Sequence, residues 1–361
     1  MIELSGFFID MEIVITLLAS VTLLATLVPI LKHEHWVVRM FDFPYVQFTV
    51  LNLVVLGACL LFTPYGNMYD GFWIAALSIS LVYRVWIIFP YTRFAHKKVP
   101  DLKTSKNELS LKVISYNVLM YNENYNGIIH AIEEENPDMV LLVETDKKWK
   151  EAVGNSFEDK LRFKVEIPLD NTYGMLFYSR FPLSKTKISC LVEDDVPSID
   201  TLVHVQKDTT IRFFGLHPKP PSPTQNETSL PRDAELIQIG KKAQKCELPV
   251  MIAGDLNDVA WSHTTRLFIR ISELLDPRMG RGFFNTYHAK HPLLRWPLDH
   301  LFLSAHFRVI SMKRLKSYGS DHFPICAMVA LRPDDKVSHN IERAKQTDKL
   351  EATEKLNRID S

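Results

Sequence analysis

The sequence predicts a layered α/β sandwich domain preceded by an N-terminal bundle of three transmembrane helices. Three long apolar runs lie within the first hundred of the 361 residues, whereas short apolar runs punctuated by turns extend from residue 109 to about residue 332. In this second part, strand candidates outnumber helix candidates and the two are interspersed, which favours a layered sandwich over a barrel.

The three apolar runs cover residues 13–31, 43–62 and 72–89. Each approaches the ~20 residues that cross a bilayer as a helix. A single run could be a signal peptide or a buried core helix, but Glu3, Asp10 and Glu12 do not suit the positively charged start of a signal peptide. Three runs in succession, separated by short polar loops, therefore predict a membrane anchor over residues 1–95.

Basic residues flank the predicted helices unequally, which predicts their orientation. They occur in the loop after the first run and in the segment after the third, at Lys32, Arg39, Arg93, Lys97, Lys98 and Lys103. The N-terminal flank and the loop at residues 63–71 carry none. The positive-inside rule then places everything after the third helix in the cytoplasm. Because Arg84 and a histidine-rich first loop complicate the count, a periplasmic or extracellular domain is the alternative.

Two polar features of the predicted anchor have both a functional and a structural interpretation. His33-Glu34-His35 resembles a ligand cluster, but beside a helix end it is more often a solvated interfacial loop. Arg84 could act inside the membrane. Near the end of its helix, with Trp86 close by, we expect it instead to extend its guanidinium group to the interface.

The rest of the chain divides into a linker, one large domain and a tail. Residues 96–108 are polar and predict a linker. Residues 109–332 are the part able to form a water-soluble core, and their number fits one large domain. Residues 333–361 are charged and predict a disordered or marginally helical tail, with a partner-binding helix as the alternative.

Short apolar runs predict the strands of this domain, and two longer runs predict helices. The predicted strands cover residues 111–116, 139–143, 174–178, 201–205, 211–216, 250–253, 300–303 and 325–331. The predicted helices cover residues 126–135 and 231–245.

Composition narrows the possible partners. Lys plus Arg and Asp plus Glu are equal at 42 each, so no global field indicates a nucleic-acid or anionic-membrane partner. The cysteines, Cys59, Cys190, Cys246 and Cys326, lie far apart without metal-ligand spacing. They predict neither a disulfide framework nor a zinc site.

Candidate functional residues gather where predicted strands end. Gly254 breaks the strand at 250–253, and Asp255 and Asn257 follow two residues apart. Their side chains lie on the same side of an extended backbone, with Leu256 opposite. A carboxylate beside a carboxamide can serve proton transfer and oxyanion binding. An Asx-rich turn is the alternative interpretation.

Asn117 and Glu144 also lie at the ends of predicted strands, the usual place for site residues in open α/β sheets. A carboxylate with an amide neighbour suits Mg²⁺, a hard cation that prefers oxygen ligands. Taken singly, Asn117 is also typical of a turn or cap, and Glu144 of a helix cap or a solvated strand end.

Two acid–histidine pairs, Asp299-His300 and Asp321-His322, follow near the end of the domain. Together they offer a histidine held by a distant carboxylate. His322 by itself would more often be structural. His217, at the end of another predicted strand, is a further candidate for contact with a phosphate or a transition-state oxygen.

The ordered set of these residues resembles the endonuclease/exonuclease/phosphatase superfamily. It comprises Asn117, Glu144, Gly-Asp-Leu-Asn at 254–257, Leu-Asp-His at 298–300 and Ser-Asp-His at 320–322. Residues 174–183, Gly-Met-Leu-Phe-Tyr-Ser-Arg-Phe-Pro-Leu, also resemble that family's Gly…Ser-Arg-Pro-Leu strand and turn. The resemblance covers residues 109–331. It implies a four-layer, DNase-like α/β sandwich and phosphoester hydrolysis with a divalent metal, Mg²⁺ or Mn²⁺.

The resemblance further implies a role for each position. Glu144 would bind the metal with Asn117 assisting, and Asp321 would complete the metal or water network. Val143 departs from the family pattern, because members usually have glutamine before the metal-binding glutamate; the ligand itself is still present.

For the catalytic side, the resemblance implies that Asp255 orients or deprotonates the attacking water while Asn257 steadies the phosphorane-like oxygens. Asp299 would hold His322, which would stabilise the transition state or assist the leaving oxygen, and His217 would contact the phosphate. Metal charge and fixed donors suit in-line displacement without a covalent intermediate.

The residues leave the substrate open. Arg295-Trp296 could contact a phosphate or stack on a base or headgroup, although a solvated face also explains it. The Pro-Lys-Pro-Pro-Ser-Pro segment at 218–223 has no evident catalytic role, and a rigid rim beside the site is one interpretation.

Three functions are consistent with the sequence. The leading one is a membrane-anchored, Mg²⁺-dependent phosphodiesterase or nuclease. The second is a phospholipid or sphingolipid headgroup phosphodiesterase, because the anchor would place the site beside a lipid bilayer. The third, of another class, is a catalytically dead membrane scaffold. No obligate protein partner is evident.

Overall fold

The computed structural model describes residues 2–62, 68–102, 109–157, 159–332 and 340–360. The chain divides into two compact units, Met1–Pro90 and Tyr91–Ser361. The boundary lies five residues before the predicted end of the anchor at residue 95.

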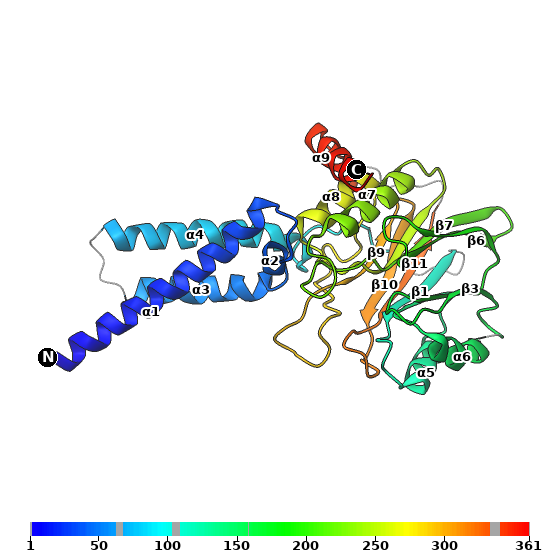
Figure 1. The fold of residues 1–361 in the computed structure, drawn as a ribbon, viewed down its shortest axis with the longest axis horizontal. Helices are drawn as coiled ribbons and strands as arrows, with labels where there is room; N and C mark the ends of the chain where they lie inside the picture. Colours follow the sequence, from blue (N-terminus) through cyan, green and yellow to red (C-terminus); the bar gives the residue numbers. More distant parts are fainter. Residues whose placement is uncertain (1, 63–67, 103–108, 158, 333–339, 361) are drawn as a thin grey trace. The chain divides into compact units, whose positions relative to one another are not determined.

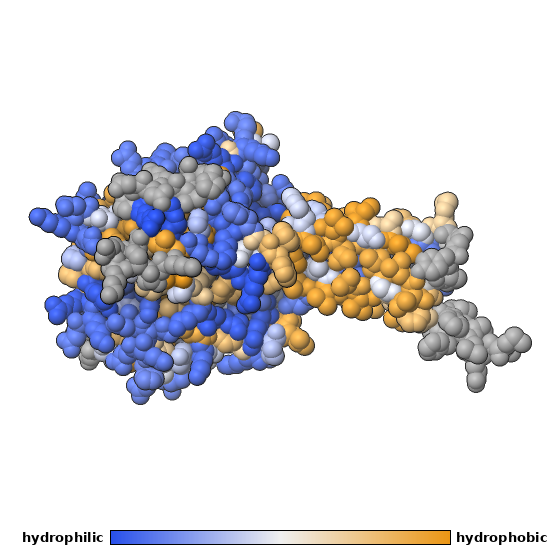
Figure 2. Space-filling model, turned by 180° about the vertical axis from the view of Figure 1, so that it is seen from behind, coloured by the Kyte–Doolittle hydropathy of each residue, from blue (hydrophilic) through white to orange (hydrophobic). Residues whose placement is uncertain are grey.

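Three long helices dominate the described part of the first unit (Figure 1): α1 (Ile2–Leu27), α3 (Tyr45–Phe62) and α4 (Met68–Ile88). Short helical turns connect and follow them, namely η1 (Val28–Leu31), α2 (Trp36–Arg39), η2 (Met40–Asp42) and η3 (Phe89–Tyr91). Residues 11–31, 45–62 and 68–91 are long and apolar enough to cross a membrane. Apolar residues cover most of the surface of this unit that Figure 2 shows. The three predicted helices are therefore confirmed.

Arg84 lies inside the helical bundle, and the interfacial position expected for it is wrong. Its side chain is fully buried, its Nε donates to the Thr26 hydroxyl at 2.8 Å, and its guanidinium lies 4.7 Å from the centre of the Tyr45 ring. Polar groups in an apolar bundle must be satisfied internally, and these partners do so. His35 has the structural role of capping α2, because its Nδ1 accepts from the backbone N–H of Val37 at 3.3 Å.

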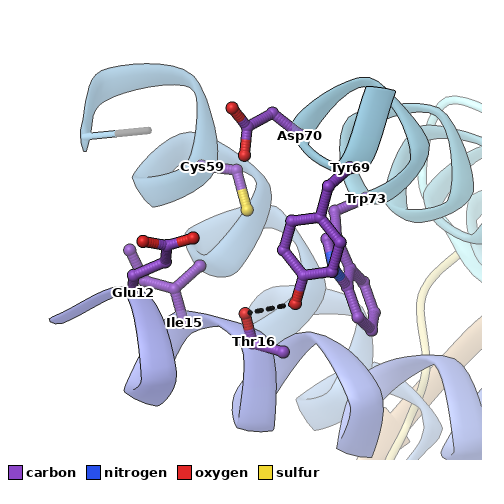
Figure 3. Close-up of a pocket in the computed structure, with 7 residues that line it drawn as sticks. All are labelled: Glu12, Ile15, Thr16, Cys59, Tyr69, Asp70 and Trp73. Carbon is purple, nitrogen blue, oxygen red and sulfur yellow. Dashed lines mark hydrogen bonds between the residues drawn. The ribbon is translucent and has the colours of Figure 1, made fainter. Parts of the chain in front are cut away.

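A small pocket in the same bundle is lined by residues of α1, α3 and α4 (Figure 3). Glu12 and Asp70 contribute carboxylates, and the hydroxyls of Thr16 and Tyr69 lie 3.3 Å apart. Asp70 is buried. The bundle thus contains a second polar region beside apolar side chains.

The second unit is built on two mixed sheets (Figure 1). The six-stranded sheet has the order β10-β11-β1-β2-β4-β3, and the five-stranded sheet the order β5-β6-β7-β8-β9. Strands of the first sheet are β1 (Ser110–Asn117), β2 (Met139–Val143), β3 (Phe163–Ile167), β4 (Met175–Ser179), β10 (Phe307–Arg314) and β11 (Ile325–Leu331). Strands of the second are β5 (Leu183–Cys190), β6 (Pro197–Gln206), β7 (Thr209–Leu216), β8 (Val250–Asp255) and β9 (Asp299–Leu303).

The main core lies between the two sheets, where Phe177 of β4 stacks on Phe213 of β7 with ring centres 4.3 Å apart. Helices α5 (Tyr125–Glu135) and α6 (Lys147–Phe157) cover the outer face of the first sheet, and α7 (Leu230–Gln244) and α8 (His263–Ser272) cover the second (Figure 1). Phe268 of α8, for example, contacts Phe302 of β9. Because both faces of each sheet are covered, β2 and β8 are apolar and buried at nearly every position. The predicted four-layer α/β sandwich is confirmed.

The described first part of the predicted linker packs within the second unit. The backbone N–H of Leu102 donates to the Val309 carbonyl, and that of Val309 donates to the Pro100 carbonyl, at 2.8 and 2.9 Å. Val99 belongs to the core between the sheets. Residues 100–102 therefore pair with β10 instead of forming a free linker, and residues 103–108 lie outside the described residues.

The tail was predicted to be disordered or marginally helical, and its last part forms helix α9 (Gln346–Asp360). Arg270 of α8 makes a two-point ion pair with Asp348, at 2.9 and 3.0 Å. Ala352 is fully buried in a small apolar cluster with α7 and α8. The sequence does not signal this helix, because it has few large apolar residues and is held largely by ion pairs.

We predict that the second unit is cytoplasmic, because basic residues follow the first and third helices and the positive-inside rule places such flanks in the cytoplasm. Cys190 is exposed, so a membrane-impermeant maleimide should label it only after cells are permeabilised. The variant Cys190→Ser identifies its share of the label. Equal labelling in intact cells would place the unit on the opposite side of the membrane.

Candidate active site

Strand direction brings the predicted residues to one edge of the sandwich. β1 and β2 are parallel neighbours, so Asn117 and Glu144 lie at the same end, and β7 and β8 place His217 and Asp255 likewise. β9 runs antiparallel to β8, and Asp299 is paired with Asp255. Residues from the ends of both sheets therefore converge, as expected for the carboxyl ends of parallel strands.

Two glycines let the backbone close up at this edge. A Cβ on Gly174 would lie 1.8 Å from the Thr145 carbonyl oxygen, and a Cβ on Gly254 would lie 1.8 Å from that of Leu216. Both distances are far below van der Waals contact, so any side chain would displace the turns after β2 and β7. Glu144 lies next to the first of these contacts and itself adopts a left-handed φ of 60°, a conformation rare for its residue type.

Asn117 connects the two sheets through its carboxamide. Its Nδ2 donates to Glu144 Oε1 at 2.7 Å and to Asp255 Oδ2 at 3.0 Å, and its Oδ1 accepts from the backbone N–H of Leu119 at 3.0 Å. The backbone donor fixes which end of the amide faces the carboxylates. Asn117 therefore holds one carboxylate from each sheet side by side.

Asp299 and His322 form a buried pair. His322 Nδ1 lies 2.7 Å from Asp299 Oδ2, and its Nε2 lies 3.5 Å from Asp255 Oδ2. Burial by itself would lower the pKa of His322, but the carboxylates of Asp299 and Asp255 outweigh it and raise the pKa to about 10. His322 is therefore an imidazolium at neutral pH, with one N–H on Asp299 and the other facing Asp255.

Asp255 stays ionised although it is buried. Burial would raise its pKa, but His322, His217 and the Asn117 hydrogen bond lower it. His217 Nε2 lies 4.0 Å from Asp255 Oδ2, and burial lowers the pKa of this histidine to about 4. The site thus contains a charged and a neutral imidazole on the same carboxylate.

Asn257 is held by three hydrogen bonds. Its backbone N–H donates to Asp255 Oδ1 at 2.9 Å, its carbonyl accepts from Arg232 at 2.7 Å, and its side-chain amide donates to the Pro218 carbonyl at 3.0 Å. Its φ of 51° is left-handed. The proline-rich segment therefore contacts a predicted site residue through its first carbonyl.

Glu144 has the electrostatic character of a ligand for a cation. Burial raises its pKa to about 7, against the opposing effect of the Asn117 hydrogen bond; the nearby carboxylates of Asp255 and Asp321 raise it further. Asp255, Asp299 and His322 also present atoms within 4.8 Å of one another. Because His322 Nδ1 is engaged by Asp299 Oδ2, the oxygens of Glu144 are the better match to a hard cation.

The structure places the remaining predicted residues in less direct positions. Arg295 donates to the carbonyls of His288 and Ala289 at 3.3 and 3.0 Å, and Trp296 stacks on Tyr287. His300 is buried against Arg278, and burial together with that arginine lowers its pKa well below the usual value. This histidine is therefore structural.

Sequence reasoning missed three residues that contact the site. The Tyr173 ring lies 5.1 Å from that of His217, and the Tyr287 ring lies 5.0 Å from that of His322. Thr286 Oγ1 accepts from the backbone N–H of Asp299 at 3.1 Å. Tyr173 precedes Gly174, which marks a turn, but nothing in the sequence signalled Thr286 or Tyr287.

Comparison with known proteins identifies the family and the fold. Residues 114–322 match the model of the endonuclease/exonuclease/phosphatase family. A protein described by that family name from Beutenbergia cavernae is 15% identical, covers 62% of this chain and 72% of its own, and has a TM-score of 0.50. Humanized D. rerio TDP2 is 17% identical, covers 61% and 99%, and has a TM-score of 0.51. D. rerio TDP2 complexed with single strand DNA product is 17% identical, covers 61% and 98%, and has a TM-score of 0.50. At these identities, the structures establish a likeness of fold. No curated protein matches the chain.

We predict that Asp299→Asn lowers the pKa of His322 from about 10 toward or below neutrality, because burial then meets less opposing charge. In the wild type, the stability that His322 contributes is full below its unfolded pKa of about 6.5 and is lost as pH rises through about 10. The variant should lose it at lower pH. Histidine NMR titration of both proteins measures the shift, and an unchanged pKa would contradict the pairing.

Proposed function

The chain belongs to the endonuclease/exonuclease/phosphatase family, and from this premise we propose that it is a membrane-anchored, divalent-metal-dependent phosphodiesterase acting on nucleic acid. The family is one of hydrolytic phosphoesterases. One observation above all supports the proposal: the Asn117 amide holds Glu144 and Asp255 together beside the Asp299–His322 pair. A dead scaffold would have no need of this set of charged groups.

Glu144 would hold the cation, Mg²⁺ or Mn²⁺, with Asp321 in support. The donor set fits, since carboxylate oxygens are the ligands that these ions prefer. Asn117 assists by orienting Glu144, because its oxygen already accepts a backbone N–H. When bound, the cation would supply positive charge to the phosphoryl oxygens.

The other residues divide the proton chemistry. Asp255 is ionised and would accept a hydrogen bond or a proton from the attacking water. The His322 imidazolium would stabilise negative charge on the leaving or phosphoryl oxygen, with Asp299 keeping it oriented. His217, which is neutral, and Asn257 would contact the phosphate as uncharged hydrogen-bond donors.

A lipid headgroup is the second candidate substrate, and an exposed hairpin beside the site favours it. Residues 286–296 fold back on themselves, with Leu293 83% exposed and Leu294 49% exposed near the tip. Within the hairpin, the backbone N–H of Ala289 donates to the Asp321 carbonyl at 2.6 Å. Apolar side chains at an exposed tip suit contact with a bilayer.

We predict that the full-length protein with Mg²⁺ cleaves single-stranded DNA, RNA or plasmid, and that His322→Ala reduces the rate by about 10²–10⁴-fold. His130→Ala, on the exposed face of α5, is the matched control and should keep the wild-type rate. Cleavage should fall steeply with salt. Hydrolysis of phosphatidylcholine or sphingomyelin vesicles alone would favour the headgroup alternative, and inactivity on every substrate would count against both.

We also predict that divalent-cation affinity rises with pH, because protons compete for a Glu144 carboxyl whose pKa is about 7. Below that value, affinity should increase roughly tenfold per pH unit and then level off. Isothermal titration with Mn²⁺ from pH 5.5 to 8 measures it. Glu144→Gln should remove the binding, whereas Glu134→Gln, at an exposed position of α5, should leave it unchanged. Affinity independent of pH would argue against Glu144 as the ligand.

A further inference from the structure

Helix α9 lies outside the residues matched by the family model, yet it contributes a buried charge. Lys355 is 5% exposed, and its Nζ lies 3.0 Å from Asp233 Oδ2 on α7. The helix is anchored on either side of this contact by the Arg270–Asp348 ion pair and by apolar packing of Leu356. Lysine is rarely buried this far unless its ammonium group is paired, and here the partner is Asp233.

The partner of Lys355 is part of a chain of charges. Arg232 contacts Asp233 Oδ1 at 3.2 Å and Asp258 Oδ2 at 3.4 Å, and all three side chains are 1% exposed. Among these four groups, two cations balance two carboxylates. Removing one partner from a buried charge network is strongly unfavourable, so neutralising Lys355 would leave excess negative charge around Arg232.

Arg232 also reaches the candidate active site. Its Nη1 donates to the Asn257 carbonyl at 2.7 Å, and the backbone N–H of Asn257 donates to Asp255 Oδ1. Asn257 adopts a left-handed φ of 51°, a conformation that asparagine tolerates but that the surrounding contacts must select. The position of Arg232 therefore bears directly on the turn that carries Asp255 and Asn257.

We propose that α9 is a positioning element of the active site and that Lys355, acting through Asp233 and Arg232, fixes the turn at residues 255–258. Lys355 is a positioning residue, since two side chains, Asp233 and Arg232, and the backbone of Asn257 separate it from Asp255. The inference rests on the proposed function for its effect on turnover, whereas its effect on the turn itself is independent of the substrate.

The variant Lys355→Met tests the proposal, because it removes the charge and keeps an unbranched side chain for packing. Lys349→Met makes the same change on the exposed face of α9 and is the matched control. Lys355→Arg restores the charge. All are compared as full-length proteins in the same detergent, with circular dichroism confirming that each is folded.

Hydrogen exchange of the segment 255–262 is the first measurement, and it needs no substrate. We expect exchange about tenfold faster in Lys355→Met, wild-type exchange in Lys349→Met, and recovery in Lys355→Arg. Unchanged exchange in Lys355→Met would overturn the inference, whatever the activity of the protein.

Turnover is the second measurement. We expect Lys355→Met to lower kcat about tenfold per folded molecule with little change in KM, and to have a much smaller effect in an Arg232→Met background, which lacks the donor to the Asn257 carbonyl. An equal effect in both backgrounds would overturn the route through Arg232. If the wild type cleaves no phosphodiester, the proposed function fails, and hydrogen exchange alone decides the inference.

Discussion

The site depends on one carboxamide that joins the two sheets. Asn117 ends β1 in the first sheet, and its Nδ2 donates both to Glu144 beside it and to Asp255 at the end of β8 in the second. Without that donor, two carboxylates would face each other at a partly desolvated edge, where like charges raise each other's pKa. Its hydrogen bonds act to lower the pKa of both carboxyls, against the effect of burial. The same amide therefore joins the two sheets and allows negative charge to gather between them.

Each sheet supplies the same structural device. A parallel pair, β1–β2 or β7–β8, is flanked on both sides by antiparallel strands, which are β11 and β4 in the first sheet and β6 and β9 in the second. All four start at the edge where the parallel pair ends, so each edge receives two strand ends and two strand starts. Asp299 opens β9 and His322 lies just before β11, so the charged pair of the site joins the two sheets a second time. Protonation follows from this geometry, because His322 lies between Asp299 and Asp255 whereas His217 approaches Asp255 alone.

The sequence predicted the layers and the residues at this edge because strand ends are marked by local features. Gly254 and the acid–histidine pairs are recognisable without knowing the fold. β3, β5 and β10 were not predicted, since the exposed sides of these outer strands dilute the apolar pattern, as the polar run in Leu183–Cys190 shows. The predictions for Arg84 and for the segment that forms α9 differ from the structure for another reason. Burial of a charge depends on partners distant in the sequence, such as Thr26 for Arg84 and Asp233 for Lys355.

Asn257 shows how much of the molecule is needed to hold one residue. Asparagine adopts a left-handed φ more readily than most residues, but the surroundings must still select that conformation. Here the side chain is held by the Pro218 carbonyl, the backbone N–H by Asp255, and the carbonyl by Arg232. The first contact explains the stiff Pro-Lys-Pro-Pro-Ser-Pro segment, because a rigid backbone presents its carbonyl at a fixed place. The contact with Arg232 depends in turn on Lys355, near the end of the chain, through Asp233. Parts of the sequence without a family motif thus act on the reacting edge through this one turn.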